Sequence, residues 1–342
     1  MDNLQYLGND TIHNLLINLT KEEAINFRKS IEQTLEDFSV GGERQYQPDP
    51  NAVTRPNGSR ALFRPFTSNQ SFGAKLIVEP SSRSDGKKDP LHGILIMLDG
   101  LGNPTGVLSA EEALWHTRLI LTLRGSEVKS ITFANPSEER IDALIKTVCE
   151  ENEARWKSNC SFHFIKTSAP DFQQQIETHL SDIDCVFCTT PSRKPLFPAS
   201  YLTKRKDSNR LPFISAIGSW QPDMIELDPE LLHHAIAADG GYSPLSGEAK
   251  GVVLVDDRDY ALLNSGEVIQ SRRTAQDMVE LGQIIAIKSG KLRNLHHEQL
   301  EQTNRYISEG FIVYKSIGIS LTDLTAANAV LALVQKKKDH HL

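Results

Sequence analysis

The sequence has no long apolar run, little cysteine and no excess of basic residues. Nothing in its 342 residues approaches the roughly 18 apolar positions of a membrane span, so we expect no membrane partner. Four cysteines are too few for a disulfide scaffold, which favours a cytoplasmic location. With 37 basic and 44 acidic residues the formal charge is −7, which argues against a nucleic-acid partner because phosphate binding needs a concentrated basic face. The first residues lack the pattern of a secretory signal, so none is expected.

A glycine-rich nucleotide-binding turn is also missing. The nearest string, Gly100-Leu-Gly102-Asn-Pro-Thr-Gly106, has the wrong spacing for GxGxxG and falls in a predicted hairpin rather than before a helix. No set of His, Cys, Asp and Glu residues has zinc-ligand spacing, so we expect no metal. Cys185 and Cys188 would point to opposite faces of a predicted strand, which argues against a redox pair.

The pattern of predicted strands and helices changes along the chain. Residues 1–39 are predicted to be helical and residues 43–60 to form a loop or an edge segment. A small, mostly antiparallel sheet follows and ends in a hairpin over residues 92–108. From Ser109 onward strands alternate with helices, which is typical of the α/β class with a doubly wound, parallel, Rossmann-type sheet. This half opens on a helix over residues 111–124 with no strand before it, although a parallel sheet normally opens with a strand.

The later elements follow the same alternation. The predicted strands are residues 130–134, 161–165, 184–189, 213–217, 251–255 and 311–314. The predicted helices are residues 136–154, 170–180, 228–238, several within 257–290, and 322–337.

Seven short segments occur in a characteristic order along the chain. They are Gly73-Ala-Lys75, Thr189-Thr-Pro-Ser192, Ala216-Ile-Gly218, Pro222-Asp-Met-Ile-Glu-Leu-Asp228, Val255-Asp-Asp257, Asp277-Met-Val-Glu-Leu-Gly282 and Tyr314-Lys-Ser-Ile-Gly318 with Asp323. By this ordered set, which covers most of residues 55–335, the chain resembles the ornithine cyclodeaminase/mu-crystallin family of NAD(P)-dependent enzymes.

The resemblance implies a domain organisation. An α+β substrate-binding and dimerisation domain, residues 1–109 plus 316–342, would carry an inserted Rossmann-like NAD(P)-binding domain, residues 110–315, and the chain would form a homodimer. It also accounts for the anomalous helix, because roughly thirty residues of the family pattern, with the first Rossmann strand and the Gly-rich turn, are absent before residue 113. A skipped exon or wrong gene model would explain this loss, and so would a diverged protein.

The resemblance also implies residues that bind a small, carboxylate-bearing substrate. Lys75 would bind the carboxylate or protonate an imine, the alternative being a lysine that snorkels at a strand edge. The family's usual arginine position holds Pro50 here, and Arg55 and Arg64 lie near enough in the sequence to replace it. Trp220 stands where cyclodeaminases place a catalytic aspartate.

The predicted cofactor residues follow strands of the α/β half. Asn135 and Ser137 stand where NAD enzymes carry an acid for the ribose, so NADP(H) is favoured over NAD(H), although they would also suit a plain helix start. The resemblance places a second group of residues near the nicotinamide and its ribose: Thr190, Pro191, Ser192, Gly218 and Ser219. It places Ser316 and Gly318 near the nicotinamide or the substrate, and Asp323 is either a ligand contact or a helix-stabilising acid.

These residues predict an NAD(P)H-dependent oxidoreductase. The chain would reduce a C=N bond of a small cyclic imine or imino acid rather than cyclodeaminate ornithine, because Trp220 cannot act as a base. Two alternatives stay open, a catalytically impaired small-ligand binder and a truncated product that folds badly.

Overall fold

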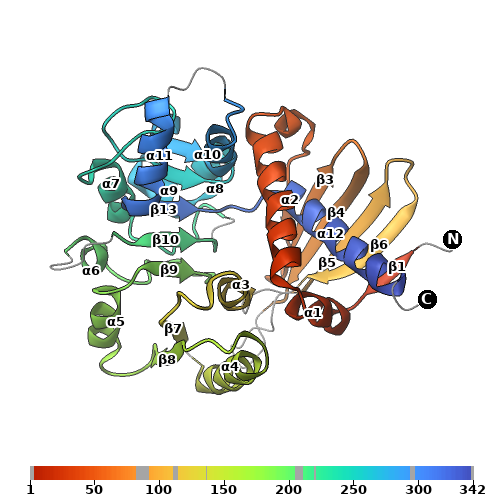
Figure 1. Ribbon diagram of the computed structural model, residues 1–342, viewed down its shortest axis with the longest axis horizontal. Helices are drawn as coiled ribbons and strands as arrows, with labels where there is room; N and C mark the ends of the chain where they lie inside the picture. The colour runs from red at the N-terminus through yellow and green to blue at the C-terminus, as the bar shows by residue number, and fades with distance from the viewer. Residues whose placement is uncertain are drawn as a thin grey trace. The chain divides into compact units, whose positions relative to one another are not determined.

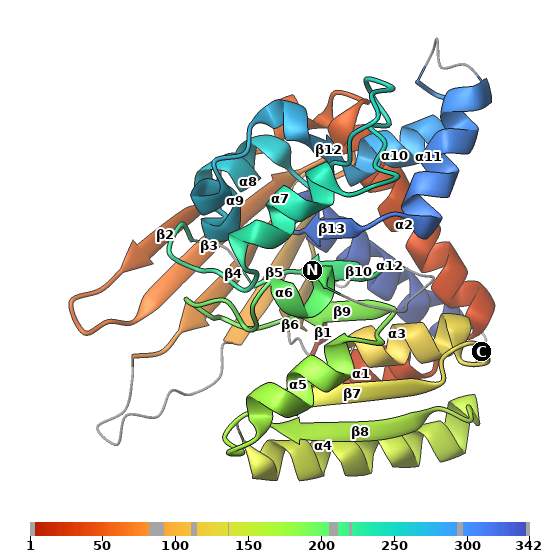
Figure 2. The ribbon, with the colours of Figure 1, turned by 90° about the vertical axis from the view of Figure 1, so that its left-hand side faces the viewer.

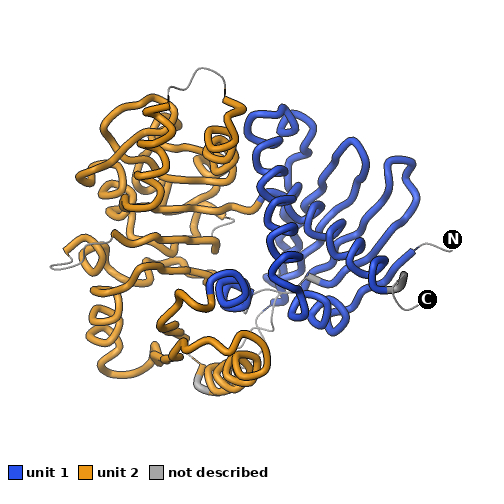
Figure 3. The backbone as a smooth tube through the Cα atoms, in the orientation of Figure 1, with its two compact units in different colours: residues 1–124, 319–342 blue, residues 125–318 orange. Residues whose placement is uncertain are grey.

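The computed structural model describes residues 4–81, 92–110, 115–135, 137–204, 211–218, 221–292 and 297–339. The chain forms two compact units, residues 1–124 with 319–342 and residues 125–318 (Figure 3). Among the residues just given, no helix combines the length and the apolar character that a membrane span requires. The domain boundaries predicted at residues 110 and 315 stay a prediction.

The first unit is a six-stranded sheet with helices packed on it. Its elements are β1 (Gln5–Leu7), α1 (Asn9–Ile17), α2 (Lys21–Ser39), the 3-10 helix η1 (Glu43–Tyr46), β2 (Asn51–Thr54), β3 (Arg60–Thr67), β4 (Ser71–Glu79), β5 (His92–Asp99), β6 (Pro104–Ala110), α3 (Trp115–Arg124) and α12 (Ser320–Asp339). The strand order is β1-β6-β5-β4-β3-β2, and all neighbours pair antiparallel except β1 and β6. Helix α12 packs on α2 and on β3, β4 and β5 (Figure 1).

Local sequence explains where the longest N-terminal helix begins. The Thr20 hydroxyl accepts a hydrogen bond from the Glu23 backbone N–H at 3.1 Å, and the Glu23 carboxylate accepts one from the Thr20 N–H at 2.9 Å. This reciprocal capping box satisfies two N–H groups that no helical carbonyl can reach. The Thr20 bonds hold the pKa of the Glu23 carboxyl below its usual value.

Alternation along the strands separates an inner face from an outer one. Leu62 and Phe66 on β3 are buried, whereas Phe63 between them is 43% exposed. Phe66 stands opposite Gly73, where a Cβ atom would lie 2.5 Å from the Phe66 ring and 2.1 Å from the Ile96 carbonyl oxygen. Glycine is therefore needed at position 73 to let the Phe66 ring lie across β4.

The second unit holds the parallel strands. Its elements are β7 (Ser130–Asn135), α4 (Glu138–Glu151), the π-helix η2 (Asn152–Trp156), β8 (Ser161–Lys166), α5 (Phe172–Leu180), β9 (Cys185–Cys188), α6 (Ser200–Thr203), β10 (Phe213–Ala216), α7 (Pro229–Ala237), β11 (Val253–Val255), α8 (Arg258–Asn264), α9 (Gly266–Ser271), η3 (Ala275–Asp277), β12 (Met278–Glu280), α10 (Leu281–Lys288), α11 (His297–Glu309) and β13 (Ile312–Lys315). Five strands form one parallel sheet in the order β12-β11-β13-β10-β9.

This sheet is buried on both faces, as a doubly wound sheet must be. Val253 and Val255 of β11 belong to one hydrophobic core, which includes Leu231 and Leu232 of α7. Leu254, between them, belongs to a second core with Tyr306 and the residues of α10 and α11. The alternation of apolar side chains into two cores explains the unbroken apolar run of β11. The predicted α/β fold with a parallel, Rossmann-like sheet is confirmed.

The parallel sheet is interrupted between β9 and β7. Strands β7 and β8 pair with each other in parallel and form a separate two-stranded sheet, which Figures 1 and 2 show on the side of β9. In a Rossmann order the first strand stands between the second and the fourth. Since β7 and β9 correspond to those two, the interruption falls at the position of the first strand, which the sequence lacks before α3.

Two short elements correct the sequence predictions. Residues 5–7 form strand β1 rather than helix, and β12 interrupts the helices expected over residues 257–290. Strand β2 lies at the edge of the first sheet, which agrees with the loop or edge segment predicted for residues 43–60. Strands β1 and β12 are three residues long each and pair in parallel with another strand. Such short segments carry too little periodicity to be recognised locally.

Candidate functional site

The first unit places two predicted substrate-binding residues side by side. Arg64 on β3 and Lys75 on β4 are direct cross-strand partners, so their side chains leave the same face of the sheet. That face packs on α12, and Lys75 Nζ donates a hydrogen bond to Asp323 Oδ1 of α12 at 3.0 Å. Arg64 is only 7% exposed, and the side chains of Lys75 and Asp323 are 13% and 23% exposed.

The cluster brings two cations and one carboxylate together. All three side chains are largely withdrawn from water. A guanidinium beside an ammonium is a pair of donors that suits a carboxylate. Asp323, which the sequence left as either a ligand contact or a helix-stabilising acid, holds Lys75 in place.

Arg55 is placed apart from this cluster. It is exposed in the turn that joins β2 to β3, where its N–H donates to the Ser59 carbonyl at 2.8 Å. Arg64 lies beyond Arg60, four residues farther along β3, so the two predicted arginines are not brought together. Arg64 is therefore the better placed of the two for a carboxylate beside Lys75.

In the second unit a buried carboxylate joins the ends of two parallel strands. The backbone N–H of Thr190, after β9, donates to Glu226 Oε1 at 2.5 Å, and the Thr190 hydroxyl donates to the same oxygen at 3.1 Å. The N–H of Gly218, after β10, donates to Glu226 Oε2 at 2.6 Å. Two predicted cofactor residues thus meet on one side chain at the carboxyl edge of the sheet, where ligands bind in this architecture.

A second buried carboxylate holds the segment that follows β13. Asp256, directly after β11, accepts hydrogen bonds from the Ser316 hydroxyl at 2.7 Å, from the Ile317 N–H at 2.9 Å and from the Gly318 N–H at 2.7 Å. Gly318 has a φ of +85°, a conformation that other residues adopt only at a cost. Burial and the nearby Asp256 raise the pKa of the Tyr314 phenol, so that group stays protonated.

The other predicted cofactor residues have local structural partners. The Ser192 hydroxyl donates to the Lys194 carbonyl at 2.6 Å, and Pro191 before it is exposed. Ser137 caps α4 by accepting from the Arg140 N–H at 3.3 Å, and its own N–H donates to Asn135 Oδ1 at 2.9 Å. Ser219 and Trp220 lie outside the described residues.

Four charged residues of this unit were not predicted as site residues. Glu226, Asp256, Glu267 and Lys315 are all buried, and none carries a family role that could be read from the sequence alone. The sequence does contain a sign of them, which is a charged residue within or directly after an apolar run. Asp256 and Lys315 follow apolar strand residues, and Glu226 stands between Ile225 and Leu227. A charged residue in an apolar run must have a partner when it is buried.

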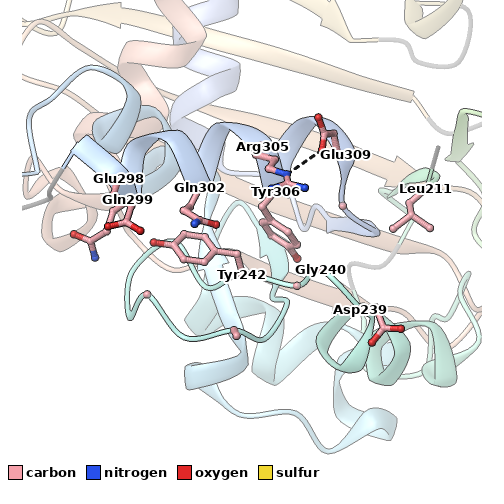
Figure 4. Close-up of a pocket in the computed structure, with 14 residues that line it drawn as sticks. Leu211, Asp239, Gly240, Tyr242, Glu298, Gln299, Gln302, Arg305, Tyr306 and Glu309 are labelled. Carbon is pink, nitrogen blue, oxygen red and sulfur yellow. Dashed lines mark hydrogen bonds and ion pairs between the residues drawn. The ribbon is translucent and has the colours of Figure 1, made fainter. Parts of the chain in front are cut away.

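A hollow of about 610 Å³ lies elsewhere in the second unit (Figure 4). It is lined mainly by α11 and by the segments before β10 and β11, including Leu211, Tyr242 and Gly310. These segments enter the sheet, so the hollow is at the amino ends of the strands, whereas Thr190 and Gly218 follow carboxyl ends. Tyr306 in its wall bonds to the backbone of Val252, and Arg305 pairs with Glu309 at 3.2 Å. The hollow contains none of the predicted site residues.

Comparisons with known proteins support this description. No protein-family model matches the chain. An uncharacterized cyclodeaminase of Dictyostelium discoideum is 26% identical over 227 residues, which is 65% of this chain and 55% of that protein. The chain spans about half the length of the curated relatives it matches, 45% and 55%.

Two solved structures cover nearly the whole chain. An archaeal alanine dehydrogenase dimer with bound NAD has a TM-score of 0.61 at 17% identity, covering 97% of this chain and 96% of that one. Thermococcus litoralis Δ1-pyrroline-2-carboxylate reductase, solved with NADH and L-proline, has a TM-score of 0.62 at 12% identity, covering 97% and 98%. At these identities the likeness establishes the fold.

The fold and the placement of polar residues at the carboxyl edge define a class, an α/β protein with a Rossmann-like sheet and a mixed six-stranded sheet. The relative described as a cyclodeaminase and the structural neighbours support an ornithine cyclodeaminase/mu-crystallin-like family, as the sequence predicted.

Proposed function

We propose that the protein is an NAD(P)H-dependent oxidoreductase that reduces a C=N bond in a small cyclic imine or imino acid bearing a carboxylate. The pair of adjacent cations on the inner face, Arg64 and Lys75, carries this proposal. A guanidinium and an ammonium on neighbouring strands can both donate hydrogen bonds to one carboxylate. A curated relative described as a cyclodeaminase and a structural neighbour solved with NADH and L-proline support the same chemistry.

The residues of the second unit fit one end of a nicotinamide dinucleotide. Hydrogen bonds hold Thr190, Gly218 and Ser316 at the carboxyl ends of strands. The ribose and ring of a nicotinamide would bind at this edge of the sheet. The phosphate end fits less well, because no glycine occurs in the sequence from Val107 to Arg124, ahead of and within α3. When bound, the cofactor would supply the hydride.

We favour NADPH over NADH as this cofactor. No acid stands at Asn135 or Ser137 to bind a ribose hydroxyl, which is the usual mark of an NAD site. Both side chains also serve the start of α4, so the preference depends on the missing acid and not on a phosphate contact.

The chain's own residues would bind the substrate and handle its proton. Arg64 would hold the carboxylate by a planar, two-pronged contact. Lys75 would either share that carboxylate or donate its ammonium proton to the imine nitrogen, while the Asp323 hydrogen bond keeps Nζ in one position. Cyclodeamination is disfavoured because the family's catalytic aspartate is replaced by Trp220.

One observation favours a second candidate, a small-ligand binder without catalysis. The interruption between β7 and β9 falls at the position of the usual phosphate-binding turn. A chain without that turn would bind the cofactor weakly or not at all. Such a binder would still use Arg64 and Lys75 for a carboxylate.

The two candidates are separated by a titration of the purified chain with NADPH and NADH, followed by fluorescence and by thermal shift. Δ1-Pyrroline-2-carboxylate would then be tested against Δ1-pyrroline, which lacks the carboxylate. We expect NADPH oxidation with the first and little with the second. Saturable binding of the imino acid without nucleotide binding would support the binder, and oxidation of both imines alike would contradict a carboxylate site.

We also propose that the chain forms a homodimer through the outer face of the six-stranded sheet. Large apolar side chains on this face are between 37% and 49% exposed: Val53, Phe63, Phe72, Val78 and Ile94. They form a continuous patch, because Phe63 and Ile94 both flank Leu76 across the strands. One structural neighbour is described as a dimer. Light scattering of the unaltered chain and of Phe63→Lys tests this, with a shift to monomer expected only in the variant.

A further inference from the structure

We propose that Glu226 is a positioning residue for the nicotinamide end of the cofactor. Its buried carboxylate would set the distance between the loops that follow β9 and β10. The proposal rests on the proposed function, since it concerns the same cofactor, and it adds a residue that contacts neither substrate nor cofactor.

Both oxygens of the Glu226 carboxylate have backbone donors. Each Glu226 oxygen accepts a backbone N–H from a different strand end, Thr190 at 2.5 Å and Gly218 at 2.6 Å. Hydrogen bonds from N–H groups to an ionised carboxylate are stronger and shorter than neutral ones. The carboxylate therefore bridges the two segments that lie just beyond Cys188 and Ile217, whose backbones pair at 3.1 Å.

The loops that Glu226 bridges approach each other closely. A Cβ atom on Gly218 would lie 1.9 Å from the Thr190 carbonyl oxygen and 2.6 Å from the Glu226 carboxyl carbon. The two loops thus meet so closely that only glycine fits. Because Thr190 and Gly218 are both predicted to lie near the nicotinamide, a change of a few tenths of an ångström here would move the site itself.

Glu226 belongs to a buried cluster of charged side chains. Lys315 Nζ lies 3.8 Å from Glu226 Oε2 and 3.2 Å from Glu267 Oε1, and all three side chains are 0% exposed. Glu267 also accepts from the Ser265 hydroxyl at 3.1 Å. Buried charges are retained only where they are paired, and Lys315 supplies the positive charge that pairs with the Glu226 carboxylate.

The cluster offers a matched control. Glu226 and Glu267 are both buried carboxylates that pair with Lys315. Glu226 accepts from the ends of β9 and β10, whereas Glu267 accepts from Ser265. Substitution by glutamine removes one negative charge at either site with little change in volume. A purely structural role of the cluster predicts similar effects of Glu226→Gln and Glu267→Gln on cofactor binding.

The experiment compares nucleotide binding by the unaltered chain, E226Q and E267Q. NADPH is titrated by its fluorescence, and 2′-phospho-ADP-ribose, which lacks the nicotinamide, is titrated in competition with it or by calorimetry. We expect E226Q to weaken NADPH binding at least 10-fold and to leave 2′-phospho-ADP-ribose binding within 2-fold, whereas E267Q changes neither beyond 2-fold. Amide hydrogen exchange at Thr190 and Gly218 should accelerate in E226Q only.

The outcomes separate this inference from the proposed function. If the unaltered chain binds NADPH and E226Q binds it equally well, the positioning role is overturned and the proposed function stands. If E226Q and E267Q weaken both nucleotides alike, the cluster is structural and the positioning role is again overturned. If the unaltered chain binds neither NADPH nor NADH, the proposed function fails and the positioning role fails with it.

Discussion

Lys75 and Asp323 are 248 positions apart in the sequence, yet Lys75 Nζ lies 3.0 Å from Asp323 Oδ1. One residue is on the fourth strand and the other is in the first turn of the last helix, so the two ends of the first unit are joined by this contact. The bond fixes the ammonium group beside Arg64, which is the geometry on which the proposed substrate site depends.

Replacing Lys75 by methionine should abolish substrate recognition without unfolding the chain. The ammonium is the group proposed to contact the carboxylate or the imine nitrogen, so we expect a loss of about 100-fold or more in kcat/KM for an imino acid. Steady-state kinetics and calorimetric binding of a carboxylate analogue measure the effect. Arg60→Met is the matched control, since Arg60 pairs with Glu79 on the same two strands. Equal losses in both variants would contradict a specific role of Lys75.

Replacing Asp256 by asparagine should destabilise the second unit. The carboxylate accepts bonds from Ser316, Ile317 and Gly318, and asparagine would present an amide N–H to one of these donors. We expect a loss of about 1.5–3 kcal/mol in the free energy of unfolding, the range for hydrogen bonds to a charged group. Urea denaturation measures it. Asp259→Asn, at an exposed neighbour, should stay within about 0.5 kcal/mol, and an equal loss there would refute the assignment.

Replacing Gly73 by alanine should destabilise the first unit. The new Cβ would lie 2.1 Å from the Ile96 carbonyl oxygen and 2.5 Å from the Phe66 ring, so the backbone and a buried ring must both move. We expect a cost of about 1–3 kcal/mol, typical of overpacking, in urea denaturation. Gly100→Ala is the comparison, because its Cβ would be no closer than 3.3 Å to any such atom. A neutral G73A would show that the Phe66 ring has another place to lie.

Stability should fall as the pH is lowered through the ordinary range of histidine. Burial in α7 against Phe311 lowers the pKa of His234, so the unfolded chain binds this proton more readily than the folded one. The stabilising contribution of the neutral ring is present above the unfolded pKa of about 6.5 and is lost as the pH falls below it. Between about pH 7.5 and 5 the melting temperature should depend less on pH in H234F than in the unaltered chain. H297Q, at an exposed site, should keep the pH dependence of the unaltered chain. The same pH dependence of the melting temperature in H234F and the unaltered chain would contradict this.

Much of the architecture was predictable because it is local. A few consecutive residues are enough to predict strands β5 and β11, which are apolar runs, and the start of α2, which is the capping box at Thr20. β1 was missed, since three residues have no measurable period and depend on pairing with β6. The interruption of the parallel sheet was foreseen from a helix that has no strand before it.

The site was predictable only in part because its geometry is not local. Lys75 and Arg64 were found separately, but their adjacency follows from the register of β3 against β4. Glu226 was not predicted, because its role lies in contacts 36 positions away at Thr190 and 8 positions away at Gly218. A charged residue within an apolar run is a sign of such contacts, yet it does not identify the partner.

The interruption beside β9 also bears on how the protein behaves in bulk. β9 ends the five-stranded order and β7 ends its pair, so each has one edge without a strand neighbour in the described structure. Neither Cys185–Cys188 nor Ser130–Asn135 contains the lysine or proline that usually blunts a strand edge. Such edges can pair with strands of other molecules. Two of them on one molecule would allow an open-ended aggregate to form rather than a closed dimer. Aggregation on storage or at high protein concentration would then depend on these two strand edges rather than on the melting temperature of either unit.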